Sequence, residues 1–111
     1  MLQDDRIRLR HMLDASNDAM QFITGYDRDD LQNNRMLLFA LVQCLEIIGE
    51  AATGVSESTR ELAPHIPWRN IVAMRNRLIH GYYDINTDIV WNTVQIELPQ
   101  LIKRLEEILA E

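Results

Sequence analysis

The segment RMLLFALVQCLEIIGEAATG, residues 35–54, constrains the fold of this chain more than any other. It is apolar around most of the circumference of a helix, whereas a helix that lies at a surface keeps one polar face. Such a helix is expected at the centre of a bundle, where it is buried on several sides. It is predicted to begin near Asn33 or Asn34 and to end near Gly54, a residue type that commonly terminates helices.

Apolar residues recur at spacings of three and four in three further stretches, which predicts amphipathic helices. These helices are expected from about Asp4 to Thr24, from Pro67 to Gly81, and from Asn86 or Thr87 to the C-terminus with a kink at Pro99. Short helical turns are also expected after Asp27 and after Ser56. The pattern predicts an all-α domain over residues 1–111, an antiparallel four-helix bundle with a short extra helical turn.

Length and composition agree with a single soluble domain, since the chain has 111 residues of which 47% are hydrophobic and 25% are charged. Only the ten residues Met36 to Leu45 separate Arg35 from Glu46, fewer than the roughly 20 apolar residues that cross a bilayer. We therefore expect no membrane span. The N-terminus carries charges and no apolar signal region, so a cytoplasmic location is expected. Cys44 is the single cysteine and is expected to be a buried, inert thiol.

The distribution of charge points to one local anion-binding region. A net charge of -6 argues against nucleic-acid binding over the whole surface, because that binding depends on neutralising phosphates. Between Arg60 and His80, however, the sequence contains one acidic residue, Glu61, and four arginines: Arg60, Arg69, Arg75 and Arg77. This reversal of sign makes the region a candidate phosphate-binding patch.

The residues RNRLIHGYY, 75–83, carry the groups that cleavage of RNA requires. An imidazole with a reference pKa of about 6.5 can accept the proton of a ribose 2′-hydroxyl. A guanidinium stays charged and holds two phosphate oxygens in its planar fork. Arg75 and His80 are therefore the candidate catalytic residues. The chemistry needs no metal or cofactor, and His11 and His65 do not have the spacing of metal ligands.

Arg75, His80 and Tyr82 spell Arg-x4-His-x-Tyr, with Asn76 directly after the arginine. The motif lies within IPWRNIVAMRNRLIHGYYDIN, and the chain also contains LEIIGEAA and WNTVQIELPQLI. In these features nearly the whole chain resembles the HepT-like toxins, which are ribonucleases of the HEPN superfamily. The resemblance implies a HEPN-like helical fold and a metal-independent endoribonuclease. It also implies a homodimer that pairs two copies of the motif in a cleft at the interface.

Site residues follow from the same resemblance, position by position. Arg75 and His80 match the catalytic pair, and Asn76 matches a polar residue that supports the site by orienting the histidine or the phosphate. Tyr82 matches a tyrosine that a small MNT-type nucleotidyltransferase antitoxin modifies with AMP from ATP. The resemblance implies RNA cleavage by 2′-hydroxyl attack, with transfer RNA as the expected substrate. An added AMP two residues from His80 would block and repel RNA.

Several alternatives remain open at this stage. Arg77 either supports the active site or forms a solvent-exposed ion pair. Glu46 and Glu50 lie one turn apart on an apolar helix, where a buried carboxylate needs a partner. Glu46 is thus expected, by a narrow margin, to hold Arg75 or Arg77, the other possibility being an exposed strip of the helix.

The function has alternatives too. The chain could be a non-catalytic helical binding subunit of a nucleotidyltransferase complex. It could also be a plain dimerisation bundle whose arginines form interface ion pairs, and an arginine near a helix C-terminus is in itself often only a cap. Trp68 and Trp91 are expected to pack in the core or in an interface.

Overall fold

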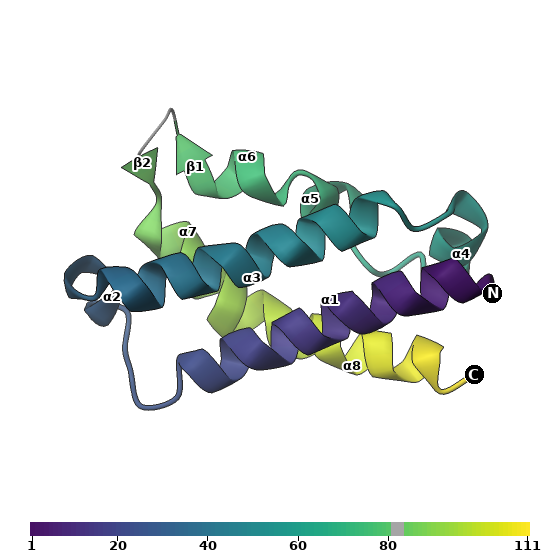
Figure 1. Cartoon of the computed structure of the whole chain (residues 1–111), viewed down its shortest axis with the longest axis horizontal. Helices are drawn as coiled ribbons and strands as arrows, with labels where there is room; N and C mark the ends of the chain where they lie inside the picture. The colour runs from purple at the N-terminus through teal and green to yellow at the C-terminus, as the bar shows by residue number, and fades with distance from the viewer. Residues whose placement is uncertain (81–83) are drawn as a thin grey trace.

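A computed structural model describes residues 1–80 and 84–111 of the chain, and of His80 it describes the backbone. The elements are α1 (Gln3–Phe22), α2 (Asp30–Asn33), α3 (Arg35–Thr53), α4 (Glu57–Leu62), α5 (Trp68–Val72), α6 (Met74–Leu78), β1 (Ile79–His80), β2 (Asp84–Ile85), α7 (Thr87–Asn92), the π-helix η1 (Thr93–Glu97) and α8 (Leu98–Leu109). Figure 1 shows α3 between α1 and the α5–α6 segment, with both termini at one end of the molecule. The all-α fold expected from the sequence is confirmed.

The direction of the chain alternates between its successive helical runs. In Figure 1, α1 and the α5–α6 segment run away from the end that holds the termini, whereas α3 and the run from α7 to α8 return to it. The most extensive contacts between elements are those of α1 with α3 and with α8. The α5–α6 segment lies against α3 on the side opposite to α1 and α8 (Figure 1).

Local signals place the helix ends close to where the sequence predicts them. The Asn34 side chain caps α3 by accepting a hydrogen bond from the Leu37 backbone N–H at 3.0 Å, and Ser56 caps α4 in the same way. Asx and hydroxyl oxygens fill this role because the first N–H groups of a helix have no partner inside it. Gly25, beyond α1, adopts φ +86°, a conformation that favours glycine.

Helix α3 supplies the centre of the core. Leu41, Leu45 and Ile48 have no exposed surface, and they pack with fully buried residues of α1 such as Leu9 and Met12. Cys44 is buried as predicted, and burial raises the pKa of its thiol to about 11.

By length and a mean hydropathy of 1.6, α3 is also apolar enough to cross a membrane, in contrast to the expectation from the sequence. Glu46 ends the uncharged run of the sequence, but the helix continues past it to Thr53. Half of the apolar window is buried inside the bundle, and a central helix has this composition for that reason. One such helix is weak evidence for a membrane span.

The helix predicted from Pro67 to Gly81 is present but interrupted, and it ends earlier than predicted. Pro67 precedes α5 as expected, but Ala73 leaves helical geometry and divides α5 from α6. Helix α6 then ends at Leu78, and the chain continues into an antiparallel ladder that pairs Ile79 with Ile85 and His80 with Asp84. Gly81, the predicted helix end, lies outside the described residues.

The C-terminal helix also differs from its prediction. It begins after Asn86, whose side chain accepts a hydrogen bond from Ile89 N–H at 3.0 Å, but the expected kink at Pro99 takes the form of the π-helix η1. Proline lacks an N–H, and its ring collides with the carbonyl four residues earlier, here that of Gln95. The wider π-turn accommodates this defect. Ile96, which lies within η1, is 56% exposed.

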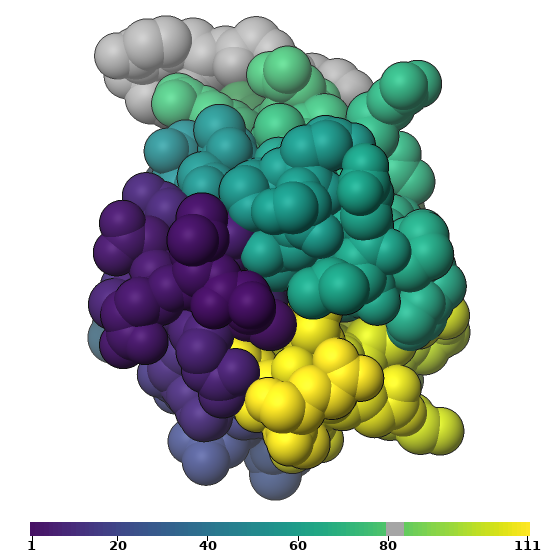
Figure 2. All heavy atoms as spheres, turned by 90° about the vertical axis from the view of Figure 1, so that its right-hand side faces the viewer, coloured from purple at the N-terminus to yellow at the C-terminus, as the bar shows by residue number. Residues whose placement is uncertain are grey.

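A buried carboxylate joins the N-terminus of α1 to α4. Asp5 is 1% exposed and accepts hydrogen bonds from the Ser56 backbone N–H at 3.1 Å, the Ser56 hydroxyl at 2.5 Å and the Thr59 hydroxyl at 2.6 Å. Figure 2 views this end of the molecule, where the purple N-terminal residues adjoin the teal segment and the yellow C-terminus. The pKa of Asp5 lies below its usual range, chiefly because the Ser56 and Thr59 hydroxyls stabilise the ionised form against the opposing effect of burial.

Candidate active site

The α5–α6 segment is held on the bundle by buried side chains that pack against the core and by a hydrogen bond at the start of α5. Trp68 is buried and donates its indole N–H to the Ala63 carbonyl at 3.0 Å, which anchors the start of α5. Ile71, Met74 and Leu78 are buried against the core. The prediction that Trp68 and Trp91 are packing residues is confirmed, since both are at most 8% exposed.

Gly49 of α3 allows this segment to approach closely. A Cβ atom at Gly49 would lie 3.0 Å from the Ile71 carbonyl oxygen and 3.2 Å from the Met74 Cβ, which is tighter than ordinary contacts. A glycine inside a helix costs stability relative to alanine, so its presence here has a packing reason. Gly49 was not among the predicted functional residues, although an isolated glycine in an apolar helix can indicate a close approach of another backbone.

Beyond α6 the backbone turns back on itself. The Asn86 backbone N–H donates to the Leu78 carbonyl at 2.8 Å, and the ladder brings Asp84 opposite His80. His80 therefore lies in the ladder and not in the helix that was predicted to continue to Gly81. The side chain of His80 and the residues 81–83, which include Tyr82, lie outside the described residues.

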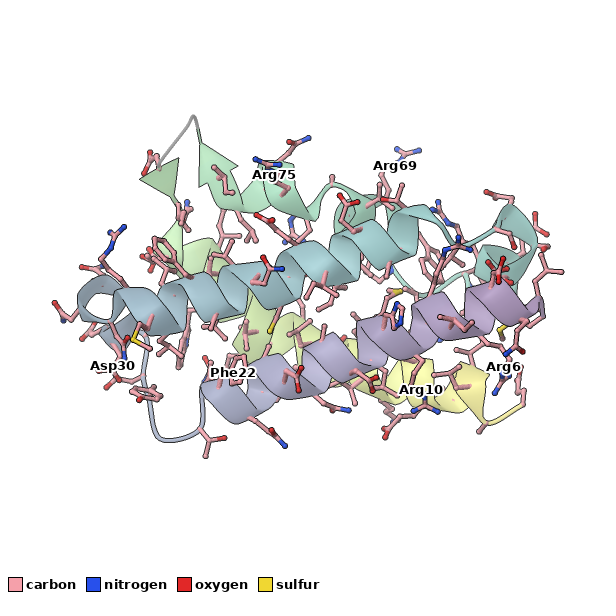
Figure 3. The ribbon with its side chains drawn as sticks, in the orientation of Figure 1. Arg6, Arg10, Phe22, Asp30, Arg69 and Arg75 are labelled. Carbon is pink, nitrogen blue, oxygen red and sulfur yellow. The ribbon has the colours of Figure 1, made fainter. Side chains whose placement is uncertain are left out.

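Arg75 and Asn76 are exposed on α6. Figure 3 shows Arg75 projecting from α6 on the side away from α3, with Arg69 on the same side at α5. Neither Arg75 nor Asn76 has a side-chain hydrogen bond or ion pair within the described parts of the chain. The guanidinium of Arg75 is therefore accessible to an anion, as its proposed chemistry requires.

Arg77, two residues further on, is already engaged. Its guanidinium forms a forked ion pair with Glu97 of η1, at 3.0 Å and 3.4 Å. The sequence left open whether Arg77 supports the active site or forms a solvent-exposed ion pair. In the structure it forms the ion pair. Glu97 was missed by the sequence analysis, because the pair joins residues 20 positions apart and depends on the π-turn that orients Glu97.

Glu46 lies in a different place from the one predicted. It lines a groove of about 510 Å³ between α1 and α3, together with Glu50, Arg8 and His11. Within the described residues neither Arg75 nor Arg77 pairs with it, because Arg77 has turned to Glu97. The expectation that Glu46 holds one of these arginines is therefore wrong. The residues with placed side chains contain no cluster of three His, Cys, Asp or Glu groups that could hold a metal ion.

The pair between Arg77 and Glu97 is expected to contribute little to stability. Arg77 is 28% and Glu97 45% exposed at the side chain, and ion pairs in such positions contribute about 0 to 1 kcal/mol. A double-mutant cycle of Arg77→Gln and Glu97→Gln, followed by urea unfolding, measures this coupling free energy. A coupling above about 2 kcal/mol would contradict the expectation and would mark the pair as a buried-type interaction.

Comparison with known proteins identifies the family of this chain. The family described as "Ribonuclease HepT-like" matches residues 12–108, a span that includes α3, the motif segment and most of α8. The chain belongs to this HepT-like ribonuclease family. The resemblance drawn from the motif and its flanks is therefore confirmed at the level of the family.

Individual members of this HepT-like family match the chain over most of its length. The protein named "Putative RNase MJ1380" from Methanocaldococcus jannaschii is 35% identical over 94% of this chain and 95% of its own length. "Putative RNase TTE0752" from Caldanaerobacter subterraneus subsp. tengcongensis is 35% identical over 97% and 96%. "Probable ribonuclease HepT" from Thermococcus cleftensis is 33% identical over 82% and 86%. No solved structure matches the chain.

Proposed function

We propose that this HepT-like protein is the toxin of a toxin–antitoxin pair, a metal-independent endoribonuclease that cleaves RNA through Arg75 and His80. The observation that carries the proposal is Arg75, which is exposed and has no side-chain hydrogen bond or ion pair among the described residues, on a segment that packs closely against α3. A family of ribonucleases supplies the reaction class. Transfer RNA is the substrate that we expect, and a cytoplasmic location follows from such a substrate.

The proposed reaction is an internal transfer at one phosphodiester. His80 takes the proton of the ribose 2′-hydroxyl, and the 2′-oxygen bonds to the adjacent phosphorus. The bond from phosphorus to the 5′-oxygen of the next nucleotide breaks, which leaves a 2′,3′-cyclic phosphate, and the departing oxygen gains a proton. Arg75 stabilises the charge that builds on the phosphate oxygens, a contribution that is often large in such reactions.

We further propose that two copies of the chain work together. A single copy brings one histidine of the motif to the cleft, whereas the reaction uses a base and an acid. A homodimer that pairs the two motif segments would supply both groups and would double the local arginine count. Asn76 then supports the cleft by orienting a phosphate or His80, since its side chain is exposed beside Arg75.

The proposed regulation acts on Tyr82. An MNT-type nucleotidyltransferase antitoxin would transfer AMP from ATP to the tyrosine hydroxyl, with release of pyrophosphate. The transferred group adds a bulky nucleotide and a negative phosphate two residues from His80. Both effects oppose the docking of RNA, because the modification places like charge where a phosphate must bind.

The test is cleavage of total cellular RNA by purified protein whose intact mass shows no added AMP, with EDTA present. We expect cleavage that is insensitive to EDTA and products that end in a 2′,3′-cyclic phosphate. A mock preparation from cells without the gene is the control for contaminating nucleases. If unmodified dimeric protein cuts no RNA, the enzyme proposal is wrong, and the chain is better regarded as a non-catalytic binding subunit of a nucleotidyltransferase complex.

A further inference from the structure

Most of the eleven basic side chains of this protein are engaged by the protein itself. Each engaged arginine contacts a carboxylate, a backbone carbonyl or an aromatic ring. These residues are Arg6, Arg8, Arg28, Arg35, Arg60, Arg77 and Arg104. In the described part of the chain, Arg10, Arg69, Arg75 and Lys103 have no such contact. Among the described residues, these four therefore keep their full charge and all their N–H donors available for an external anion.

Two of these residues lie on the same side of the molecule. In Figure 3, Arg69 on α5 and Arg75 on α6 both project away from α3, whereas Arg10 lies on the far side of the bundle, at the edge formed by α1 and α8. Both Arg69 and Arg75 are exposed. The two arginines lie on either side of the break at Ala73, in a stretch of only eleven residues from Trp68 to Leu78, so one extended anionic chain along this side could contact both side chains.

The surroundings of Arg69 and Arg75 favour an anion. Residues 62–83 contain no Asp or Glu, although the whole chain has 17 acidic residues. Arg10, in contrast, has Asp14 one turn away on its own helix, and Lys103 is followed at a similar distance by Glu106 and Glu107. An anionic polymer is therefore attracted to the α5–α6 side and not to the other free cations.

One boundary of this region is defined by α4. A groove of about 440 Å³ between α4 and α5 is lined by Arg69 of α5 and by Glu57, Arg60 and Glu61 of α4. These carboxylates repel phosphate, so the favourable path runs from Arg69 toward Arg75 and not across the groove. Arg77 adds no free charge to the path because Glu97 neutralises it.

We propose that Arg69 is a second phosphate-binding residue, which contacts the backbone of single-stranded RNA that extends from the reacting phosphate at Arg75 along α5–α6. The proposal rests on the ribonuclease function proposed above. It adds the direction in which the bound RNA extends from the reacting phosphate. Arg69 touches a phosphate that does not react, so it stabilises the bound substrate and the transition state equally. Its loss raises KM and leaves kcat unchanged.

The test compares Arg69→Gln with Arg10→Gln, a matched replacement of an exposed arginine on the far side of the bundle. Binding of a short fluorescein-labelled single-stranded RNA of mixed sequence is measured by anisotropy over a range of salt concentrations, in a His80→Ala background that prevents cutting. Arg69→Gln is expected to weaken binding about tenfold and to reduce the slope of log K against log salt by about 0.7. In the His80-containing enzyme it raises KM by a similar factor. Arg69→Lys restores part of the affinity, because it keeps the charge.

The outcomes separate this inference from the proposed function. Weaker binding and a smaller salt slope in Arg69→Gln alone support it. Equal changes in Arg69→Gln and Arg10→Gln, or no change in either, overturn it while cleavage by the wild type leaves the ribonuclease proposal intact. A fall in kcat at constant KM also overturns it, since that result would place Arg69 in the chemical step. A wild type that neither binds nor cuts RNA removes both.

Discussion

Replacing His80 by alanine is expected to lower the rate of RNA cleavage by about 10²- to 10⁴-fold and to leave the fold intact. The rate falls because the 2′-hydroxyl loses the base that accepts its proton. The fold persists because His80 contributes its backbone to the ladder with Asp84, and alanine retains the same N–H and carbonyl. Cleavage rates at saturating RNA and far-UV circular dichroism measure the two parts of this prediction.

His65→Ala is the matched control for this experiment. His65 is exposed in the loop before α5, and its interaction with Arg104 uses the backbone carbonyl, which the substitution keeps. The control is expected to cleave RNA at the wild-type rate. Added imidazole is expected to restore part of the activity of His80→Ala, because a free base can occupy the space that the side chain leaves. An unchanged rate in His80→Ala would exclude His80 as the base.

Local patterns were sufficient to predict most helices of this protein. The apolar period located α1, α3 and α8, and short-range capping signals at Asn34, Ser56 and Asn86 located helix starts. Each of these signals acts over three or four residues, so it is present in the sequence itself. The catalytic candidates were found in the same way, because Arg75 and His80 lie in one short motif.

The features that the sequence did not predict depend on contacts between residues far apart in the chain. The break at Ala73 has no local signal, and it lies where Gly49 of α3 contacts both Ile71 and Met74. The partner of Arg77 was assigned to the wrong carboxylate, since periodicity gives the face of a helix but not the neighbouring helix that it meets. Pro99 predicted a defect in the C-terminal helix without specifying that it would be a π-turn. Tertiary packing determines each of these features.

A second large effect is expected at the other end of the molecule, at Asp5. Asp5→Ala is expected to lower the free energy of unfolding by about 2 to 4 kcal/mol. The change leaves the hydroxyls of Ser56 and Thr59 and the Ser56 N–H without their acceptor, in a place that is 1% exposed to water. Urea unfolding at a fixed protomer concentration measures the loss, since association of the chain would also affect stability.

Asp4→Ala is the matched control, because Asp4 occupies the same first turn of α1 but is exposed. It loses only a favourable interaction with the helix dipole and is expected to change stability by less than about 1 kcal/mol. Equal losses for Asp4→Ala and Asp5→Ala would show that charge in the first turn matters and the hydrogen bonds to α4 do not.

The same carboxylate predicts how stability depends on pH. Because the folded pKa of Asp5 lies below its unfolded value near 3.9, the unfolded state binds the proton more readily. The contribution of Asp5 is therefore fully present above about pH 4 to 5, and it is lost as the pH falls through the lower folded pKa. Asp5→Asn cannot titrate, so the difference in unfolding free energy between wild type and Asp5→Asn should shrink on acidification. A difference that stays constant down to pH values below the folded pKa would mean that the hydrogen bonds hold the α1–α4 junction together without the charge.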